Sequence, residues 1–137
     1  MRKQLFVAVT VLVALVVPAA ASTAPPQKLT WGTPSLLSAP VGGSASEGVT
    51  LTNTGGAKIT LELATTTFVG DPNQWLTDVG CQGVTLAKGE SCTQPVTFTP
   101  SLAAQVGDVA SITISARDPK HPTTTPATVT IQAQVSQ

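Results

Sequence analysis

Cys81-Gln-Gly-Val-Thr-Leu-Ala-Lys-Gly-Glu-Ser-Cys92-Thr-Gln-Pro-Val-Thr-Phe-Thr-Pro100 is the one stretch of the chain in which cysteines, turn glycines and a strand-like alternation meet. Its second cysteine, Cys92, is in phase with Val96 and Phe98, and Pro100 ends the alternation. Side chains on one face of a strand recur at every second position. The stretch therefore predicts a glycine-containing loop that leads into a strand over 93–99.

The N-terminus has the three parts of an export signal. Arg2 and Lys3 are followed by an apolar run over 5–17 and by small residues up to Ala21. The apolar run is too short to span a bilayer. We therefore predict a signal peptide over 1–21 and a flexible lead-in over 22–28. The alternative is an uncleaved N-terminal anchor, for which the small-residue boundary would have no purpose.

Export would determine both the compartment of the protein and the net charge of its mature chain. We expect a protein that is secreted, or held in the periplasm or cell envelope, with no stable membrane span after signal cleavage. Loss of Arg2 and Lys3 lowers the basic residues from 7 to 5 against 7 acidic ones, so the mature net charge is about −2. The remaining Lys and Arg are scattered, whereas nucleic-acid binding needs them clustered. No nucleic-acid partner is expected.

The two cysteines are best explained as a structural disulfide, because disulfides form and persist in the oxidising compartments that an exported chain reaches. Closing the loop between Cys81 and Cys92 would stabilise the fold by about 3 kcal/mol on the loop-entropy model. A redox pair normally has only two intervening residues, and His121, the one histidine, cannot complete a zinc site. No metal or other cofactor is predicted.

Short alternating segments, rich in Thr and Val and separated by turn residues, predict an all-β sandwich or barrel over 29–137. The segments 47–53 and 58–64 flank Thr54-Gly55-Gly56 and predict a β-hairpin. The other expected strands are an edge strand within 28–37 that Pro34 interrupts, a short one near Phe68, and those over 93–99, 109–116 and 127–135. With few aromatic residues, the core must be mostly aliphatic.

Two tryptophans are the candidates for a binding surface. Trp31 and Trp75 each offer a large apolar face with one hydrogen-bond donor. In a domain so poor in aromatic residues, the alternative is that both fill the core or plug a loop. We expect Phe68 and Trp75 to be the apolar anchors of the irregular stretch 65–79.

Few polar residues call for a chemical role. Asn53 lies at an inward strand phase before Gly55-Gly56, and we interpret it as a residue that organises the turn. His121 is near Asp118, but catalysis would also need a nucleophile and a fixed geometry, which the neighbouring prolines disfavour. Asp71, Asn73 and Asp78 match no compact calcium loop. No catalytic residue is predicted.

A family resemblance completes the interpretation. The chain resembles the bacterial choice-of-anchor D type domain, which is related to the immunoglobulin-like modules of abnormal-spindle and hydin proteins and more distantly to major sperm protein domains. The resemblance covers about 31–135 and implies a seven-stranded, immunoglobulin-like Greek-key β-sandwich without catalytic residues, usually found in surface or secreted proteins. It rests on Val49-Thr-Leu-Thr-Asn-Thr-Gly-Gly56, Phe68, Cys81, Leu86-Ala-Lys-Gly-Glu-Ser-Cys92, Val96-Thr-Phe-Thr-Pro100, Ile112-Thr-Ile-Ser115 and Val129-Thr-Ile131.

Complete strand patterning without a cluster of titratable side chains leads to two hypotheses. The first is a secreted, non-enzymatic module that binds a protein or a surface glycan through loops or a sheet edge. The second is a structural or accessory subunit of a cell-envelope or surface assembly. In that case the terminal strand over 127–135, which has little charge, would add to a partner's sheet.

Overall fold

The computed structural model describes residues 28–137, so the predicted signal peptide and all of the lead-in except Lys28 lie outside the described residues. The described part is built from β-strands and one short 3-10 helix, which confirms the all-β class. It contains no helix long and apolar enough to cross a bilayer. The elements are β1 (Leu29–Trp31), β2 (Leu37–Pro40), β3 (Ala45–Asn53), β4 (Ile59–Thr60), β5 (Glu62–Val69), η1 (Pro72–Gln74), β6 (Trp75–Thr77), β7 (Thr85–Leu86), β8 (Ser91–Phe98), β9 (Val109–Arg117) and β10 (Ala127–Ser136).

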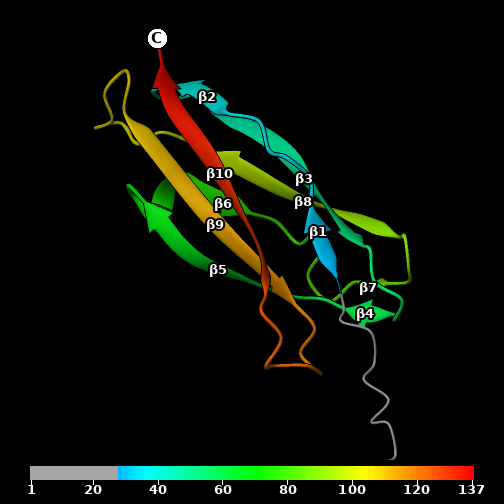
Figure 1. The fold of residues 1–137 in the computed structure, drawn as a ribbon. Helices are drawn as coiled ribbons and strands as arrows, with labels where there is room; N and C mark the ends of the chain where they lie inside the picture. Colours follow the sequence, from blue (N-terminus) through cyan, green and yellow to red (C-terminus); the bar gives the residue numbers. More distant parts are fainter. Residues whose placement is uncertain (1–27) are drawn as a thin grey trace, which may run out of the picture.

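Two four-stranded sheets form an immunoglobulin-like β-sandwich, and β4 pairs with β7 beside them (Figure 1). The first sheet has the order β1-β3-β8-β6, and the second has the order β2-β10-β9-β5. Neighbouring strands are antiparallel except β2 and β10, which run parallel. Within residues 28–137, the free edges of the sheets are therefore β1 and β6 in the first and β2 and β5 in the second.

The core lies between the sheets and follows the alternation of the sequence. Inward positions on β8, β9 and β10 are buried, while the residues between them are mostly exposed or half-buried. As expected from the composition, most of these core residues are aliphatic. The largest fully buried side chains are those of Phe98, Leu51, Ile59, Leu61, Ile112, Ile131, Val96, Asn53 and Cys81.

The first expected edge strand is divided between the two sheets. β1 pairs with β3 in the first sheet, whereas β2 pairs with β10 in the second. Pro34 lies in the connection, where the missing N–H breaks no ladder bond. The proline break is thus the point at which the chain crosses from one sheet to the other.

The predicted β-hairpin of 47–53 with 58–64 is wrong. β3 pairs with β1 on one side and β8 on the other, so both of its edges are occupied. The chain after Asn53 instead forms β4, which pairs with β7, and β5, which pairs with β9 in the second sheet. The Gly55-Gly56 turn therefore connects the two sheets, and local alternation cannot distinguish this from a hairpin.

The expectation that the terminal strand could serve as a free edge is also wrong. β10 has β9 on one side and β2 on the other. Its covering strand, β2, comes from a distant part of the sequence and pairs in parallel. A strand's low charge shows that it tolerates a neighbour, but the neighbour in this case belongs to the same chain.

Candidate binding surface along strand β5

The longest free edge among residues 28–137 is β5, which has β9 as its one strand neighbour. We define the β5 edge as residues 63–69, which carry no charged side chain and no proline. Charge, proline, shortness and β-bulges are the usual features by which natural edge strands avoid pairing with another chain. Of these, the β5 edge has only a bulge between Thr65 and Thr67.

The inner face of β5 is only partly covered. Leu63, Thr65 and Phe68 lie opposite Ala116, Ile114 and Ile112, so they point toward the other sheet as those buried residues do. Nevertheless, Thr65 is exposed and Phe68 is 39% exposed. The strand predicted near Phe68 is confirmed, but its expected role as an apolar anchor is wrong, because the facing edge strand β6 has only three residues.

A groove of about 220 Å³ opens beside the β5 edge between the two sheets. One wall is formed by Leu63, Ala64 and Thr65 of β5. The opposite wall is the end of β6 and the segment 78–82 that follows it. The groove is thus bounded by an unpaired strand on one side and by the start of the disulfide loop on the other.

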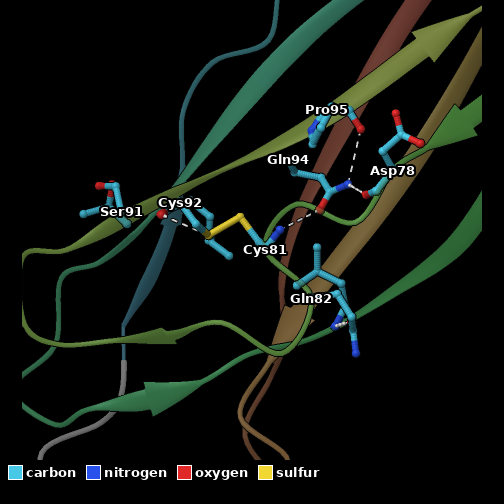
Figure 2. The surroundings of a disulfide bond; sticks show 10 residues. Asp78, Cys81, Gln82, Ser91, Cys92, Gln94 and Pro95 are labelled. Atoms are coloured by element: carbon cyan, nitrogen blue, oxygen red, sulfur yellow. Dashed lines mark hydrogen bonds between the residues drawn. A yellow bond between two sulfur atoms is a disulfide. The ribbon is translucent and has the colours of Figure 1, made fainter.

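The predicted disulfide between Cys81 and Cys92 is confirmed, and it holds this second wall in place (Figure 2). The two Cα atoms are 5.5 Å apart, and Cys81 is fully buried. Gly80 allows the close approach, because a Cβ atom there would lie 2.6 Å from the carbonyl oxygen of Thr93 on β8. The segment 78–82 is therefore fastened tightly to β8.

Gln94 forms a second attachment of the segment 78–82 to β8, which the sequence analysis missed. This side chain of β8 is 3% exposed and faces inward. Its Oε1 accepts a hydrogen bond from the N–H of Cys81 at 3.0 Å, and its Nε2 donates to the carbonyl of Asp78 at 2.6 Å. A polar residue in the inward phase between Cys92 and Val96 was the available signal in the sequence.

Gln82 joins the two walls and shows which backbone groups are free. Its Oε1 accepts a hydrogen bond from the N–H of Leu63 at 2.7 Å, so this N–H points away from β9. Leu63 and Phe68 pair with Ala116 and Ile112, which are an even number of positions apart on β9, so both have the same backbone orientation toward β9. The β-bulge between Thr65 and Thr67 accounts for the odd spacing of Leu63 and Phe68 on β5. The N–H and C=O of Phe68 therefore also point away from β9, toward the open edge.

The structure does not bring the two candidate tryptophans together. Trp31 lies on β1 and Trp75 on β6, the opposite edges of the first sheet. Both are half-buried against the core: the Trp31 Nε1 donates to the carbonyl of Ala127 at 3.1 Å, and the Trp75 ring lies 5.1 Å from that of Phe98. Their principal contacts are structural, and a binding role for either stays a prediction.

The remaining polar candidates have structural roles. Asn53 organises its turn as expected, since Nδ2 donates to the carbonyls of Ala57 and Leu86 and Oδ1 accepts from the N–H of Gly55. His121 Nδ1 is 3.1 Å from Asp118 Oδ2, and Asp118 Oδ1 accepts from the N–H of Lys120 within the same turn. Across 28–137, no three His, Cys, Asp or Glu residues are grouped so as to hold a metal ion.

No family model matches the chain, and no curated protein matches its sequence. Similar folds are found among solved structures. A PapD-like domain of human CEP192 has a TM-score of 0.56 at 15% identity, with 93% of this chain and 98% of that chain covered. The SrpA adhesin of Streptococcus sanguinis has a TM-score of 0.53 at 21% identity, with 85% and 60% covered.

A family 123 glycoside hydrolase from Clostridium perfringens has a TM-score of 0.57 at 8% identity, and this chain spans only 27% of it. At these identities the likeness shows the fold alone. The comparisons therefore support an immunoglobulin-like or PapD-like sandwich. The narrower resemblance to the choice-of-anchor D domain stays a prediction.

Proposed function

We propose that the mature domain is an exported, non-enzymatic module that binds a protein partner through the β5 edge. The observation that carries the proposal is the combination of a free, uncharged strand with an inner face that β6 leaves partly uncovered. An incoming extended segment could pair with the free backbone groups and place alternate side chains over Thr65 and Phe68.

When a strand is added to a sheet edge, affinity and specificity come from different contacts. Main-chain hydrogen bonds give affinity to almost any extended segment, whereas pockets for alternate side chains choose among sequences. The groove between Leu63, Thr65 and Val79 is such a pocket, and Asp78 gives it an acidic rim. A partner segment with a basic residue near this rim would be favoured over an acidic one.

The fold of the SrpA adhesin is consistent with a binding module, although the likeness shows only the architecture. The proposal therefore rests on the β5 edge itself. Photo-crosslinking provides the test. We would place a benzophenone amino acid at Thr67 on the β5 edge or, as a matched control, at Thr128 on the central strand β10, whose side chains are both exposed.

Each labelled mature domain would be irradiated with the extracellular and envelope fractions of its source. We expect a discrete protein adduct from position 67 and none from position 128. A Thr67→Lys variant labelled at the exposed Val69 should lose most of that adduct, because an edge lysine discourages pairing. Equal labelling at both positions, or no adduct at 67, would overturn the proposal.

A further inference from the structure

We infer that one partner of the β5 edge is a second copy of this chain, bound through antiparallel pairing of the two β5 strands about a twofold axis at Phe68. This inference rests on the proposed function, and it commits the edge to a self-complementary interface. In a twofold interface the same surface is presented by both copies, so β5 must be compatible with itself.

The β5 strand meets that requirement electrostatically. From Leu63 to Gly70 the chain has no charged residue, so no register within this stretch brings like charges together. The flanking charges lie beyond it at Glu62, which is paired with Arg117 at 2.9 Å, and at Asp71. Like charges placed directly opposite each other would destabilise a strand pair, and this cost is absent.

The backbone selects the register. The N–H and C=O of Phe68 point toward the open edge, so two copies of this residue can exchange both hydrogen bonds across the axis. Thr67 then lies opposite Val69 of the partner subunit, and all four of these side chains are on the outer face, as their pairing with Thr113 and Ser111 shows. A register centred nearer to Leu63 would have to displace the Gln82 side chain.

The exposed apolar side chains are concentrated at the same end of β5. Phe68 is 39% exposed and Val69 is 55% exposed, and Val69 borders a hollow of about 400 Å³ on the outer face together with Val109 and Leu36. An axis at Phe68 places the Phe68 and Val69 side chains of both copies at the centre of the contact. Such clustered apolar surface is typical of interaction sites.

The contact is short, and this limits its strength. Stable interfaces usually bury about 1,600 Å² in total, and a pair of short strands buries less. We therefore expect a reversible dimer that dissociates on dilution, with half dissociation at about 10–100 μM.

Sedimentation velocity on the mature domain, residues 22–137, measures this association directly. Between about 5 and 500 μM the wild type should shift from monomer toward dimer. Phe68→Lys and Phe68→Glu should each remain monomeric, because the twofold axis brings identical charges together. An equimolar mixture of the two variants should dimerise again. Circular dichroism would confirm that each variant is folded, and Thr67→Lys provides an edge variant that leaves the inner face unchanged.

Disulfide trapping locates the axis. Because two residues at a hydrogen-bonded antiparallel pair have Cα atoms about 5.5 Å apart, Phe68→Cys should crosslink to itself under mild oxidation. Ala64→Cys, on the same strand but away from the axis, should not. Both variants keep the native pair of Cys81 and Cys92, so both carry the same risk of disulfide exchange.

The outcomes separate the two proposals. A wild type that stays monomeric at every concentration, or a dimer that neither charge variant disrupts, would overturn the second-copy inference. Neither result would affect the proposed function, which fails if position 67 captures no other protein or if positions 67 and 128 are labelled equally. Failure of the mixed charge variants to dimerise, while the wild type does, would overturn the placement of the axis at Phe68.

Discussion

The two free edges of the second sheet, β2 and β5, differ in how well they are protected from pairing. β2 has four residues, ends at Pro40, and follows a connection that contains Pro34. β5 has eight residues, and neither proline nor charge occurs over 63–69. Short, proline-containing edges resist the addition of another strand, whereas long, uncharged ones accept it. The same sheet therefore has one closed side and one open side.

The open side is also the side that the disulfide loop supports. Cys81, Gln82 and Gln94 hold the segment 78–82 against β8 and connect it to Leu63 at one end of β5. The disulfide thus supports the proposed binding edge as well as the fold. Removing the disulfide or these hydrogen bonds should destabilise the β5 side of the sheet and leave the stability of β2 unchanged.

The largest effect is expected from removing the disulfide. Replacing both Cys81 and Cys92 with Ala should lower the free energy of unfolding by about 3 kcal/mol, because the unfolded chain loses its closed loop. Urea unfolding measures the loss. Hydrogen exchange of the folded variant should accelerate over 78–82 while β2 is unaffected. Uniform acceleration along the chain would contradict a local role for the disulfide.

Gln94→Ala should lower the free energy of unfolding by about 2 kcal/mol, since it leaves the buried N–H of Cys81 and the carbonyl of Asp78 without their present partners. The matched control is Gln132→Ala, in an exposed position on β10, for which we expect a change within about 0.5 kcal/mol. Equal losses in the two variants, measured by thermal or urea unfolding, would show that Gln94 does not fasten the loop.

A lysine placed on each edge in turn tests the comparison itself. Thr67→Lys on β5 should weaken self-association about tenfold, whereas Ser38→Lys on β2 should leave it unchanged. Both side chains are exposed, so the two variants should be about equally stable. Sedimentation equilibrium measures the dissociation constants, and a larger effect at Ser38 would assign the open side to β2.

The smallest effect is expected from Gln82→Ala, which frees the N–H of Leu63 on an exposed edge. Stability should fall by no more than about 1 kcal/mol, because water can replace the lost hydrogen bond. The amide of Leu63 should nevertheless exchange faster with solvent. Unchanged exchange at Leu63 would mean that the Gln82 side chain does not protect this end of the edge in solution.

Most of the individual strands could be predicted from alternation, and the disulfide from the number of cysteines and the predicted export signal. What the sequence alone could not show was pairing between distant segments. Asn53 before two glycines has the pattern of a hairpin, and only the occupation of both edges of β3 excludes one. In the same way, the parallel pairing of β2 with β10 decides that β5 is exposed and the terminal strand is not.

The candidate site was missed for a related reason. Trp31 and Trp75 are the candidates that size alone indicates, yet both are half-buried against the core. Phe68 was expected to be buried because it is apolar, but its burial depends on the length of β6 in the opposite sheet. Exposure of an inward-facing residue follows from the packing of two sheets, and no pattern within one strand contains that information.

Amide hydrogen exchange, followed by NMR at two protein concentrations, tests most directly whether β5 is the edge through which the domain associates. The account predicts that the N–H of Phe68 exchanges freely in dilute solution and becomes protected as concentration rises, while the amides of β2 do not change. Exchange at Phe68 that is independent of concentration, or protection that rises equally on β2, would contradict it.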